Sequence, residues 1–287
     1  MGAWSDWPSA NCTKMKSDFS PEARYVDISG VRLAYDVGGR GANLLFLHGG
    51  LLDRRMWDRQ FAFFSTKYRT IRYDMRGAGQ TETTPSAEPF THHEDLHDFL
   101  GALKINRVSL VGLSNYAVAL DFTIAHPQLI EKLVLVSPGL RGYEPRDPWL
   151  RTNFASMMQA LGKQDLTGAV EVFISMWVDG PYRMPTDVDS AVREQVREMA
   201  TRSLGLSRLA PNCTGLEPPA AGRLSEVHVP TLIILGDKDA PDIQAIGQLI
   251  RKGVTGSRLE TIRDAGHTLT MEKPHEFNEQ VEDFLRL

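Results

Sequence analysis

The sequence lacks the features that would place the chain among disulfide-stabilised, membrane-spanning or nucleic-acid-binding proteins. Cys12 and Cys213 are the only cysteines in 287 residues, too few for a disulfide framework. No apolar run approaches the roughly 18 residues that a membrane-spanning helix needs. Long basic runs are missing as well, and Lys+Arg 32 against Asp+Glu 36 gives a net charge of −4. We therefore expect neither nucleic acid nor a membrane as a partner.

The amino-terminal residues also lack something, because residues 1–23 contain no apolar segment of the kind found in an intact export signal. We expect them to form a poorly ordered lead-in and the protein to be cytoplasmic, with export followed by removal of a leader as the alternative. The composition, 42% hydrophobic and 24% charged, is that of an ordinary globular protein. Such a chain is expected to act on a small molecule as a monomer or a homodimer.

What the sequence does contain is a regular alternation of short apolar runs and helix-like stretches. The runs expected to be strands are Arg24–Ile28, Val31–Val37, Leu44–Leu47, Thr70–Asp74, Val108–Leu113, Lys132–Ser137, Thr231–Leu235 and Leu259–Ile262. The helical patterns are Trp57–Ser65, Phe90–Leu103, Asn115–His126, Ile243–Arg251 and Pro274–Leu287. This alternation predicts an α/β fold with a doubly wound, mainly parallel sheet, and a site at the carboxyl ends of its strands.

One interval, residues 138–229, departs from the alternation. It shows no strand signal and three helix-like stretches, Pro148–Leu161, Leu166–Val178 and Val188–Leu204. We expect a helical cap here, inserted into an α/β core made of residues 24–137 and 230–287. The side chains expected to line a largely hydrophobic substrate pocket are Trp149, Met176 and Trp177 of the cap, with Leu51 and Tyr116 of the core.

Ser114 stands between a buried strand and a helix-like stretch. At such a sharp junction the hydroxyl is held clear of the backbone and beside the free N–H groups of the helix, as a nucleophile requires. The pattern Gly-x-Ser is common by itself, and a second copy at 205–207 follows no strand. The assignment of Ser114 therefore depends on the rest of the chain.

Two glycines follow the strand at 44–47, in the segment His48-Gly49-Gly50. Glycine allows a tight turn and exposes a backbone N–H, which can stabilise a developing oxyanion. We expect Gly50 to supply one oxyanion donor. The second is expected from the N–H of Asn115, because the residue after the nucleophile begins a helix.

An acid and a base are available in two later loops. Asp237 and Asp239 both follow the strand at 231–235, and either carboxylate can orient a histidine. His267 follows the last predicted strand. An imidazole titrates near neutral pH, so this side chain is a suitable general base.

With these segments the chain resembles the α/β-hydrolase fold superfamily over residues 24–287, and in particular the small bacterial esterases and enol-lactonase-like hydrolases. The matching segments are His48–Gly50, Tyr73–Thr81, the segment around Ser114, Gly236–Asp239 and Gly266–His267. Serine, acid and histidine follow one another along the chain in the order found in this superfamily. The resemblance implies a catalytic triad of Ser114, Asp239 and His267. It also implies a carboxylic ester hydrolase or lactonase with an oxyanion hole, working through an acyl-enzyme without a cofactor or metal.

One residue departs from the family pattern, because Tyr116 stands where relatives carry a small residue, most often glycine. A bulky side chain at a tightly packed junction weakens the expectation of full activity. Two alternatives therefore stay open. The first is hydrolysis of a carbon–carbon bond in a diketone-type substrate, and the second is a ligand-binding sensor with weak or no turnover.

Two further motifs suggest other chemistry. His93-Glu94-Asp95-Leu96-His97 fits the zinc-binding pattern His-Glu-x-x-His, but no convincing third ligand follows it, and its apolar residues suit packing of a helix on a sheet. The segment Arg76–Gly79 has too few glycines for a dinucleotide-binding loop. We expect Asp74 and Arg76 to brace the turn near the site instead.

Overall fold

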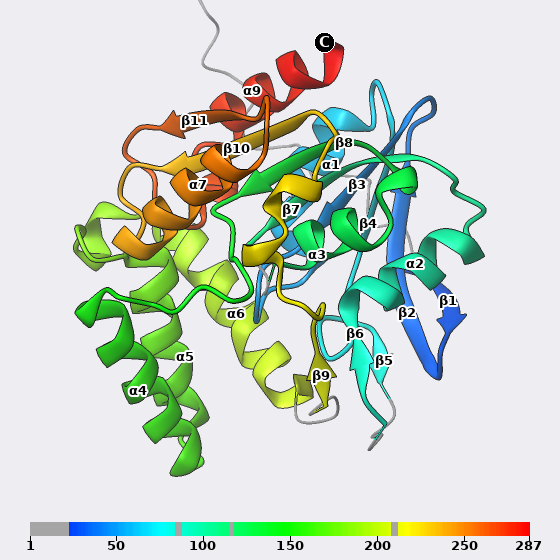
Figure 1. The fold of residues 1–287 in the computed structure, drawn as a ribbon. Helices are drawn as coiled ribbons and strands as arrows, with labels where there is room; N and C mark the ends of the chain where they lie inside the picture. The colour runs from blue at the N-terminus through cyan, green and yellow to red at the C-terminus, as the bar shows by residue number, and fades with distance from the viewer. Residues whose placement is uncertain (1–22, 84–87, 115–116, 208–211) are drawn as a thin grey trace, which may run out of the picture.

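The computed structural model describes residues 23–83, 88–114, 117–207 and 212–287. The expected lead-in, apart from its last residue, lies outside this range. Nine strands of the described residues form one sheet in the order β1-β2-β4-β3-β7-β8-β10-β11, with β5 paired to β2 (Figure 1). Their bounds are β1 Arg24–Ile28, β2 Val31–Gly38, β3 Asn43–Leu47, β4 Arg69–Tyr73, β5 Glu82–Thr83, β7 Val108–Leu113, β8 Ile130–Val136, β10 Thr231–Gly236 and β11 Arg258–Ile262.

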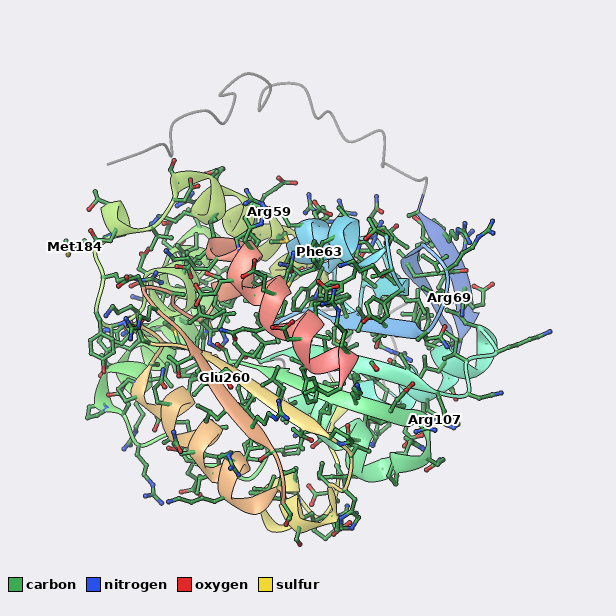
Figure 2. All side chains as sticks on the ribbon, turned by 90° about the horizontal axis from the view of Figure 1, so that it is seen from above. Arg59, Phe63, Arg69, Arg107, Met184 and Glu260 are labelled. Atoms are coloured by element: carbon green, nitrogen blue, oxygen red, sulfur yellow. The ribbon has the colours of Figure 1, made fainter. Side chains whose placement is uncertain are left out.

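The sheet is parallel from β4 to β11, and β1, β2 and β5 are the antiparallel part. Both of its faces are covered by helices. On one face lie α2 (His92–Ala102), α3 (Val118–Ala125) and α7 (Pro241–Gly253). On the other lie α1 (Asp58–Phe64) and α9 (Pro274–Arg286), and Figure 2 shows α9 crossing over the strands. The prediction of a doubly wound, mainly parallel sheet is confirmed.

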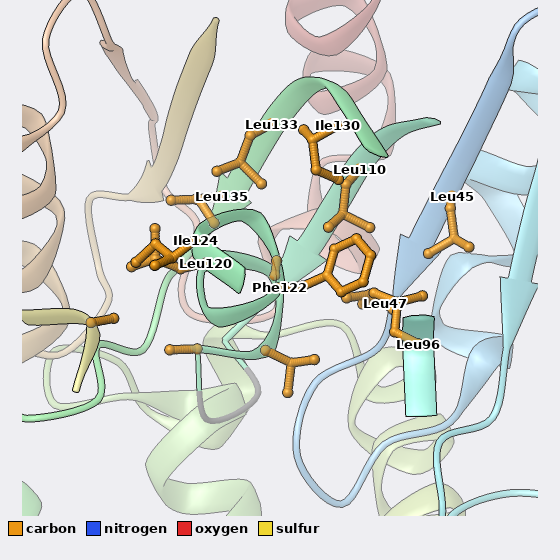
Figure 3. Packing of buried hydrophobic residues seen from close by; sticks show 14 of the residues in the cluster. Leu45, Leu47, Leu96, Leu110, Leu120, Phe122, Ile124, Ile130, Leu133 and Leu135 are labelled. Carbon is orange, nitrogen blue, oxygen red and sulfur yellow. The ribbon is translucent and has the colours of Figure 1, made fainter. Parts of the chain in front are cut away.

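The central strands are apolar along their whole length because each of them packs on both faces. In β3, Leu45 and Leu47 face the layer of α2 and α3, whereas Leu44 and Phe46 face the layer of α1 and α9. Figure 3 shows Leu47 next to Phe122 of α3, with Leu45 in the same cluster. Burial on both faces replaces the alternation of an open sheet with a continuous apolar run.

The interval between β8 and β10 holds three helices that pack on one another in sequence: α4 (Pro148–Gly162), α5 (Leu166–Ile174) and α6 (Ser190–Ser207) (Figure 1). We call α4 to α6 the helical insertion. Where the sequence predicted a helix as far as Val178, the α-helix ends at Ile174 and a π-helix, Ser175–Asp179, continues it. A π turn is wider than an α turn, and single π turns are frequent at functional sites.

Residues 138–229, which show no strand signal in the sequence, nevertheless hold a strand of two residues. β9 (Cys213–Thr214) pairs in parallel with β6 (Phe90–Thr91) to form a separate two-stranded sheet. A strand of two residues has no periodicity to detect, and its partner is far away in the sequence, so only the tertiary fold brings the two segments together. Among the described residues no helix is both long and apolar enough to cross a bilayer.

Candidate active site

Ser114 directly follows β7, at the carboxyl edge of the parallel sheet, and its backbone has a positive φ of 52°. A left-handed conformation is uncommon for a residue with a side chain, and here hydrogen bonds maintain it. The Ser114 N–H donates to the carbonyl of Val136 at 2.9 Å, and its carbonyl accepts from the N–H groups of Ala117 and Gly139 at 3.2 and 3.3 Å. The junction is thus fixed by its backbone to the end of β8 and to the start of α3.

The junction is also tightly packed, because α3 begins close to the last residues of β7. A methyl group on Gly112 would lie 2.6 Å from the Cβ of Ala119. Only glycine fits at position 112 without moving the helix away from the strand. Asn115 and Tyr116 lie outside the described residues, so the expected second oxyanion donor, the unusual tyrosine and its predicted place in the substrate pocket stay predictions.

His267 and Asp239 lie together at the ends of β11 and β10. The imidazole Nδ1 is 2.8 Å from Asp239 Oδ2, and the two side chains are only 5% and 1% exposed. Asp239 Oδ1 accepts a second hydrogen bond from the N–H of Ala240 at 2.7 Å. Since an ionised carboxylate can only accept, His267 carries its proton on Nδ1 and leaves Nε2 as the basic nitrogen.

The other candidate acid, Asp237, points elsewhere. It forms an ion pair with Lys238 at 3.2 Å and accepts a long hydrogen bond from the Ala265 N–H at 3.4 Å. Of the two carboxylates that follow β10, the structure therefore brings to the histidine Asp239, the one that the family resemblance implied.

A cavity of about 420 Å³ is lined by both Ser114 and His267. Beyond these two residues and their neighbours, its wall comes from four parts of the chain: the loop after β3, the segment after β8, the helical insertion and the start of α7. Most lining side chains are apolar, among them Leu140, Leu150, Phe154, Met157, Phe173 and Ile246. The Ser114 hydroxyl and the buried His267–Asp239 pair thus lie at one largely apolar cavity. Electrostatic interactions in such surroundings are stronger than in water.

Gly50 lines this cavity, and no described residue accepts a hydrogen bond from its N–H. The loop that carries it is held by the buried His48 side chain. His48 Nδ1 donates to the carbonyl of Gly49 at 2.9 Å, and Nε2 accepts from the Met75 N–H at 3.0 Å. Burial lowers the pKa of His48, so the ring stays neutral and can make both bonds.

The predicted pocket residues divide into two groups. Leu51 and Trp177 line the cavity, and the indole of Trp177 lies 4.4 Å from the His267 ring, with the planes 41° apart. Trp149 and Met176 are not among the described lining residues: Met176 is completely buried in the core, and Trp149 packs against the same core. Adjacent residues of a helix point about 100° apart, so Trp177 can face the cavity while Met176 faces the core, and the sequence alone does not decide which does so.

Asp242 is a lining residue that the sequence analysis missed. It accepts hydrogen bonds from the Tyr143 hydroxyl at 2.7 Å and from the N–H groups of Arg146 and Asp147, each at 2.9 Å to the nearer oxygen. Burial favours a raised pKa for Asp242, but these bonds outweigh it and the pKa is lowered. The carboxylate ties the segment that leads into α4 to the start of α7. Its position three residues after Asp239 was the one signal available.

The residues of the zinc-like motif lie in α2 with other partners. His93 is buried, with Nε2 3.5 Å from Thr91 Oγ1, and the His97 ring stacks on His126 at 4.4 Å. Glu94 contacts His126 Nε2 at 3.1 Å. In the part of the chain that the structure describes, no three His, Cys, Asp or Glu side chains are grouped to hold a metal ion.

Asp74 and Arg76 each brace the region after β4, through different partners. Asp74 accepts from the N–H groups of Arg54 and Gln80 at 2.8 and 2.7 Å, and it also pairs with the Arg54 side chain. Arg76 forms a two-point ion pair with Asp95 of α2, at 2.7 and 2.9 Å. The loop is thereby attached to its neighbours on two sides.

Comparison with known proteins identifies the family. A provisionally named 2-succinyl-6-hydroxy-2,4-cyclohexadiene-1-carboxylate synthase of Bacillus subtilis is 28% identical over 89% of this chain and 95% of its own. A strigolactone esterase of Arabidopsis thaliana is 27% identical over 87% and 93%. The crystal structure of an enol-lactonase from Burkholderia xenovorans superposes with a TM-score of 0.73 at 22% identity, covering 92% of this chain and all of that one. The model of the alpha/beta hydrolase family matches residues 44–280, and the chain belongs to this family.

Proposed function

We propose that the protein is a serine hydrolase that cleaves a carboxylic ester or a lactone of a small, largely hydrophobic substrate. One observation carries the proposal. Ser114, in its left-handed strand–helix junction, lines the same cavity as His267, whose Nδ1 is bonded to the buried Asp239. A hydroxyl beside a base that a carboxylate orients is the arrangement of serine hydrolases on several unrelated folds.

In this proposal His267 Nε2 removes the proton of the Ser114 hydroxyl while Oγ forms a bond to the substrate carbonyl carbon. Asp239 stabilises the imidazolium that results. The tetrahedral intermediate collapses as the bond to the leaving oxygen breaks and the imidazolium gives that oxygen its proton. Water, deprotonated by the same imidazole, then attacks the acyl carbon. The bond from this carbon to Ser114 Oγ breaks as the imidazolium returns its proton to Oγ, and the acid is released. With a lactone the alcohol and the acid remain parts of one molecule.

The oxyanion formed in both steps needs donors that do not have to rearrange. The N–H of Gly50 suits this role because it borders the cavity and none of the described residues accepts its hydrogen bond. The N–H of Asn115 is the second donor in the proposal. Loss of one such donor costs on the order of 10² in rate in other serine enzymes.

The cavity supports a hydrophobic substrate of moderate size. Its volume of about 420 Å³ lies toward the lower end of ordinary ligand pockets. The helical insertion acts as a cap in this proposal, since Leu150, Phe154 and Trp177 contribute apolar wall above the serine. The names of an esterase and an enol-lactonase among the similar proteins favour ester or lactone chemistry.

A panel of nitrophenyl esters of increasing acyl length, together with simple lactones, tests the proposal. We expect turnover that Ser114→Ala lowers by several orders of magnitude, because this change removes the nucleophile. A fluorophosphonate should add to Ser114, as mass spectrometry of the digested protein would reveal. Ligand binding without turnover would favour the sensor instead, and cleavage confined to vinylogous diketones would favour the carbon–carbon bond hydrolase.

A further inference from the structure

The loop that carries His267 is held on both sides by one buried carboxylate. Glu272, the last residue of the short helix α8 (Leu269–Glu272), accepts hydrogen bonds at Oε1 from the Gly266 N–H at 3.2 Å and from Thr268 Oγ1 at 3.0 Å. Its side chain is 7% exposed. The two residues that flank the histidine are therefore attached to a single oxygen atom.

That carboxylate is paired with an arginine that follows the π-helix of the insertion. Arg183 Nη1 forms an ion pair with Glu272, and the guanidinium is 8% exposed. The same guanidinium donates from Nη2 to the carbonyl of Val178 at 2.6 Å and from Nε to the carbonyl of Asp179 at 3.0 Å. Arg183 thus bonds to the end of the π-helix on one side and to the carboxylate under the histidine loop on the other.

The π-helix in turn carries Trp177, whose indole packs against the His267 ring at 4.4 Å. The insertion consequently contacts the histidine in two ways: directly through an aromatic ring, and indirectly through Arg183 and Glu272. The packing leaves no spare room, because a methyl group on Gly266 would collide with Arg183 Nη2. Glycine is required before the histidine so that the loop can lie on the guanidinium.

We propose that Arg183 and Glu272 are positioning residues, which lock the histidine loop to the helical insertion and so fix the direction of the His267 ring toward Ser114. The inference rests on the proposed function in that it takes His267 as the general base. It adds that the insertion orients the base as well as enclosing the substrate. Closing or loosening the insertion then changes the reactivity of the serine even where no substrate contact changes.

A purely stabilising role explains the arrangement less well. Removing a guanidinium and a carboxylate from water is costly, and a buried ion pair often contributes little net stability compared with apolar residues of the same size. What such a pair does supply is a fixed geometry, because its donors and acceptors have definite directions. Here the hydrogen bonds join Glu272 to residues 266 and 268, and they join Arg183 to the turn that follows Trp177.

The test compares two variants with a matched control. Glu272→Gln keeps the shape of the side chain and removes its charge, and Thr268→Val removes one hydrogen bond to Glu272 with little change in volume. Glu282→Gln is the control, because it is the same substitution at a glutamate of α9 whose side chain is 10% exposed and pairs with Lys67 and Arg286 away from the cavity. All three should unfold cooperatively, as circular dichroism would show.

Two measurements are made on each protein. The first is the downfield proton NMR resonance of His267 Nδ1–H in the protein without ligand, assigned by its loss in His267→Ala. It needs no substrate, so it remains informative even if the protein hydrolyses no ester. The second is the rate at which a nitrophenyl phosphonate modifies Ser114.

We expect the Nδ1–H signal to broaden through faster exchange with water in both test variants. The phosphonylation rate should fall by about tenfold to a hundredfold in Glu272→Gln, since small misplacement of a reacting group has effects of this size. A smaller fall in the same direction is expected for Thr268→Val, and Glu282→Gln should stay within about twofold of the wild type.

An unaltered Nδ1–H signal and an unaltered rate in Thr268→Val and Glu272→Gln would overturn the inference and leave the pair a structural one. If Glu272→Gln fails to fold, Thr268→Val alone decides. A wild-type protein that shows the Nδ1–H signal but reacts with no phosphonate would contradict the proposed function, while the NMR comparison would still judge the positioning role.

Discussion

Asp239 Oδ2 lies 2.8 Å from His267 Nδ1, whereas Asp237, two residues earlier in the same loop, pairs with Lys238. The chain turns at residues 237–239, where the Asp239 N–H donates to the carbonyl of Gly236, so the two carboxylates have different partners. The relationship makes a direct experimental comparison possible, because the same change can be made at each position.

Asp239→Asn should lower kcat on a nitrophenyl ester by about 10⁴, since an amide can bond the histidine in the wrong tautomer. Asp237→Asn should leave kcat within about threefold of the wild type, because its neighbours are a surface lysine and one long hydrogen bond. Steady-state kinetics of the two purified variants provide the check. Equal losses at both positions would contradict the assignment of the acid.

Trp177 lines the cavity and packs against the His267 ring, so truncation of the indole should expose the base to water. We expect Trp177→Ala to lower kcat/KM by about tenfold, the equivalent of a buried aromatic contact, and Trp177→Phe to have a smaller effect. Met176→Leu is a suitable control, because Met176 points into the core and not into the cavity. Equal effects of Trp177→Ala and Met176→Leu on kcat/KM would argue against a wall formed by Trp177.

Asp242 joins the segment before α4 to the start of α7, and its hydrogen bonds should make the free energy of unfolding depend on pH in a definite direction. Hydrogen bonds from Tyr143, Arg146 and Asp147 hold the pKa of Asp242 below its ordinary value of 3.8. A carboxyl with a lowered pKa in the folded protein stabilises it above the unfolded pKa, and this contribution is lost as the pH falls through the folded value.

Asp242→Asn should therefore lower the free energy of unfolding by about 1–3 kcal/mol at pH 7, because the new NH₂ group faces donors. The difference from the wild type should shrink as the pH falls below about 4. Urea unfolding at several pH values measures it. A difference that stays constant from pH 7 to pH 3 would show that the charge of Asp242 has no part in joining the two segments.

The contact of β7 with α3 predicts a destabilising substitution and a partial rescue. Gly112→Ala should cost about 1–3 kcal/mol of stability, since the added methyl meets the Cβ of Ala119 at 2.6 Å. Adding Ala119→Gly removes that contact and should recover part of the loss, less about 1 kcal/mol for a glycine in a helix. Thermal unfolding of the single and double variants would reveal whether the two changes are coupled.

The zinc-like motif supplies the last prediction. His97 is stacked on His126, and His93 is buried beside Thr91, so these imidazoles have other contacts. Dialysis against a strong chelator should leave ester hydrolysis unchanged. Loss of activity that added zinc restores would instead place a metal at this helix, and His97→Ala would then abolish the restoration.

Much of the fold follows from the sequence because its strands are apolar on both faces. The runs at 44–47, 108–113 and 231–235 are buried strands of the sheet, as expected from their lack of alternation. Some strand boundaries differ from the expected ones by one or two residues, as at β8, which begins at Ile130 and not at Lys132. Hydrogen-bond registers decide such ends, and they depend on the partner strand.

The candidate site was predictable in its parts because each part follows a strand. Ser114 directly follows β7, and Asp239 and His267 lie in the loops that follow β10 and β11. The carboxyl ends of these strands share one edge of a parallel sheet. The local chain therefore determined which residues reach that edge. It also determined the glycines at 112 and 266, whose small size allows close packing at the strand–helix junction and in the histidine loop.

Tertiary structure alone decided which of these groups meet. It turned Trp177 toward the cavity and Met176 away from it, and brought Arg183 to Glu272 across 89 residues of sequence. Asp239 was implied by the family resemblance, and the fold brought it, and not Asp237, to the histidine. Composition and periodicity specify which side of an element is apolar, because that property is local. The direction of a single side chain depends on contacts between distant segments, and those contacts exist only once the core has packed.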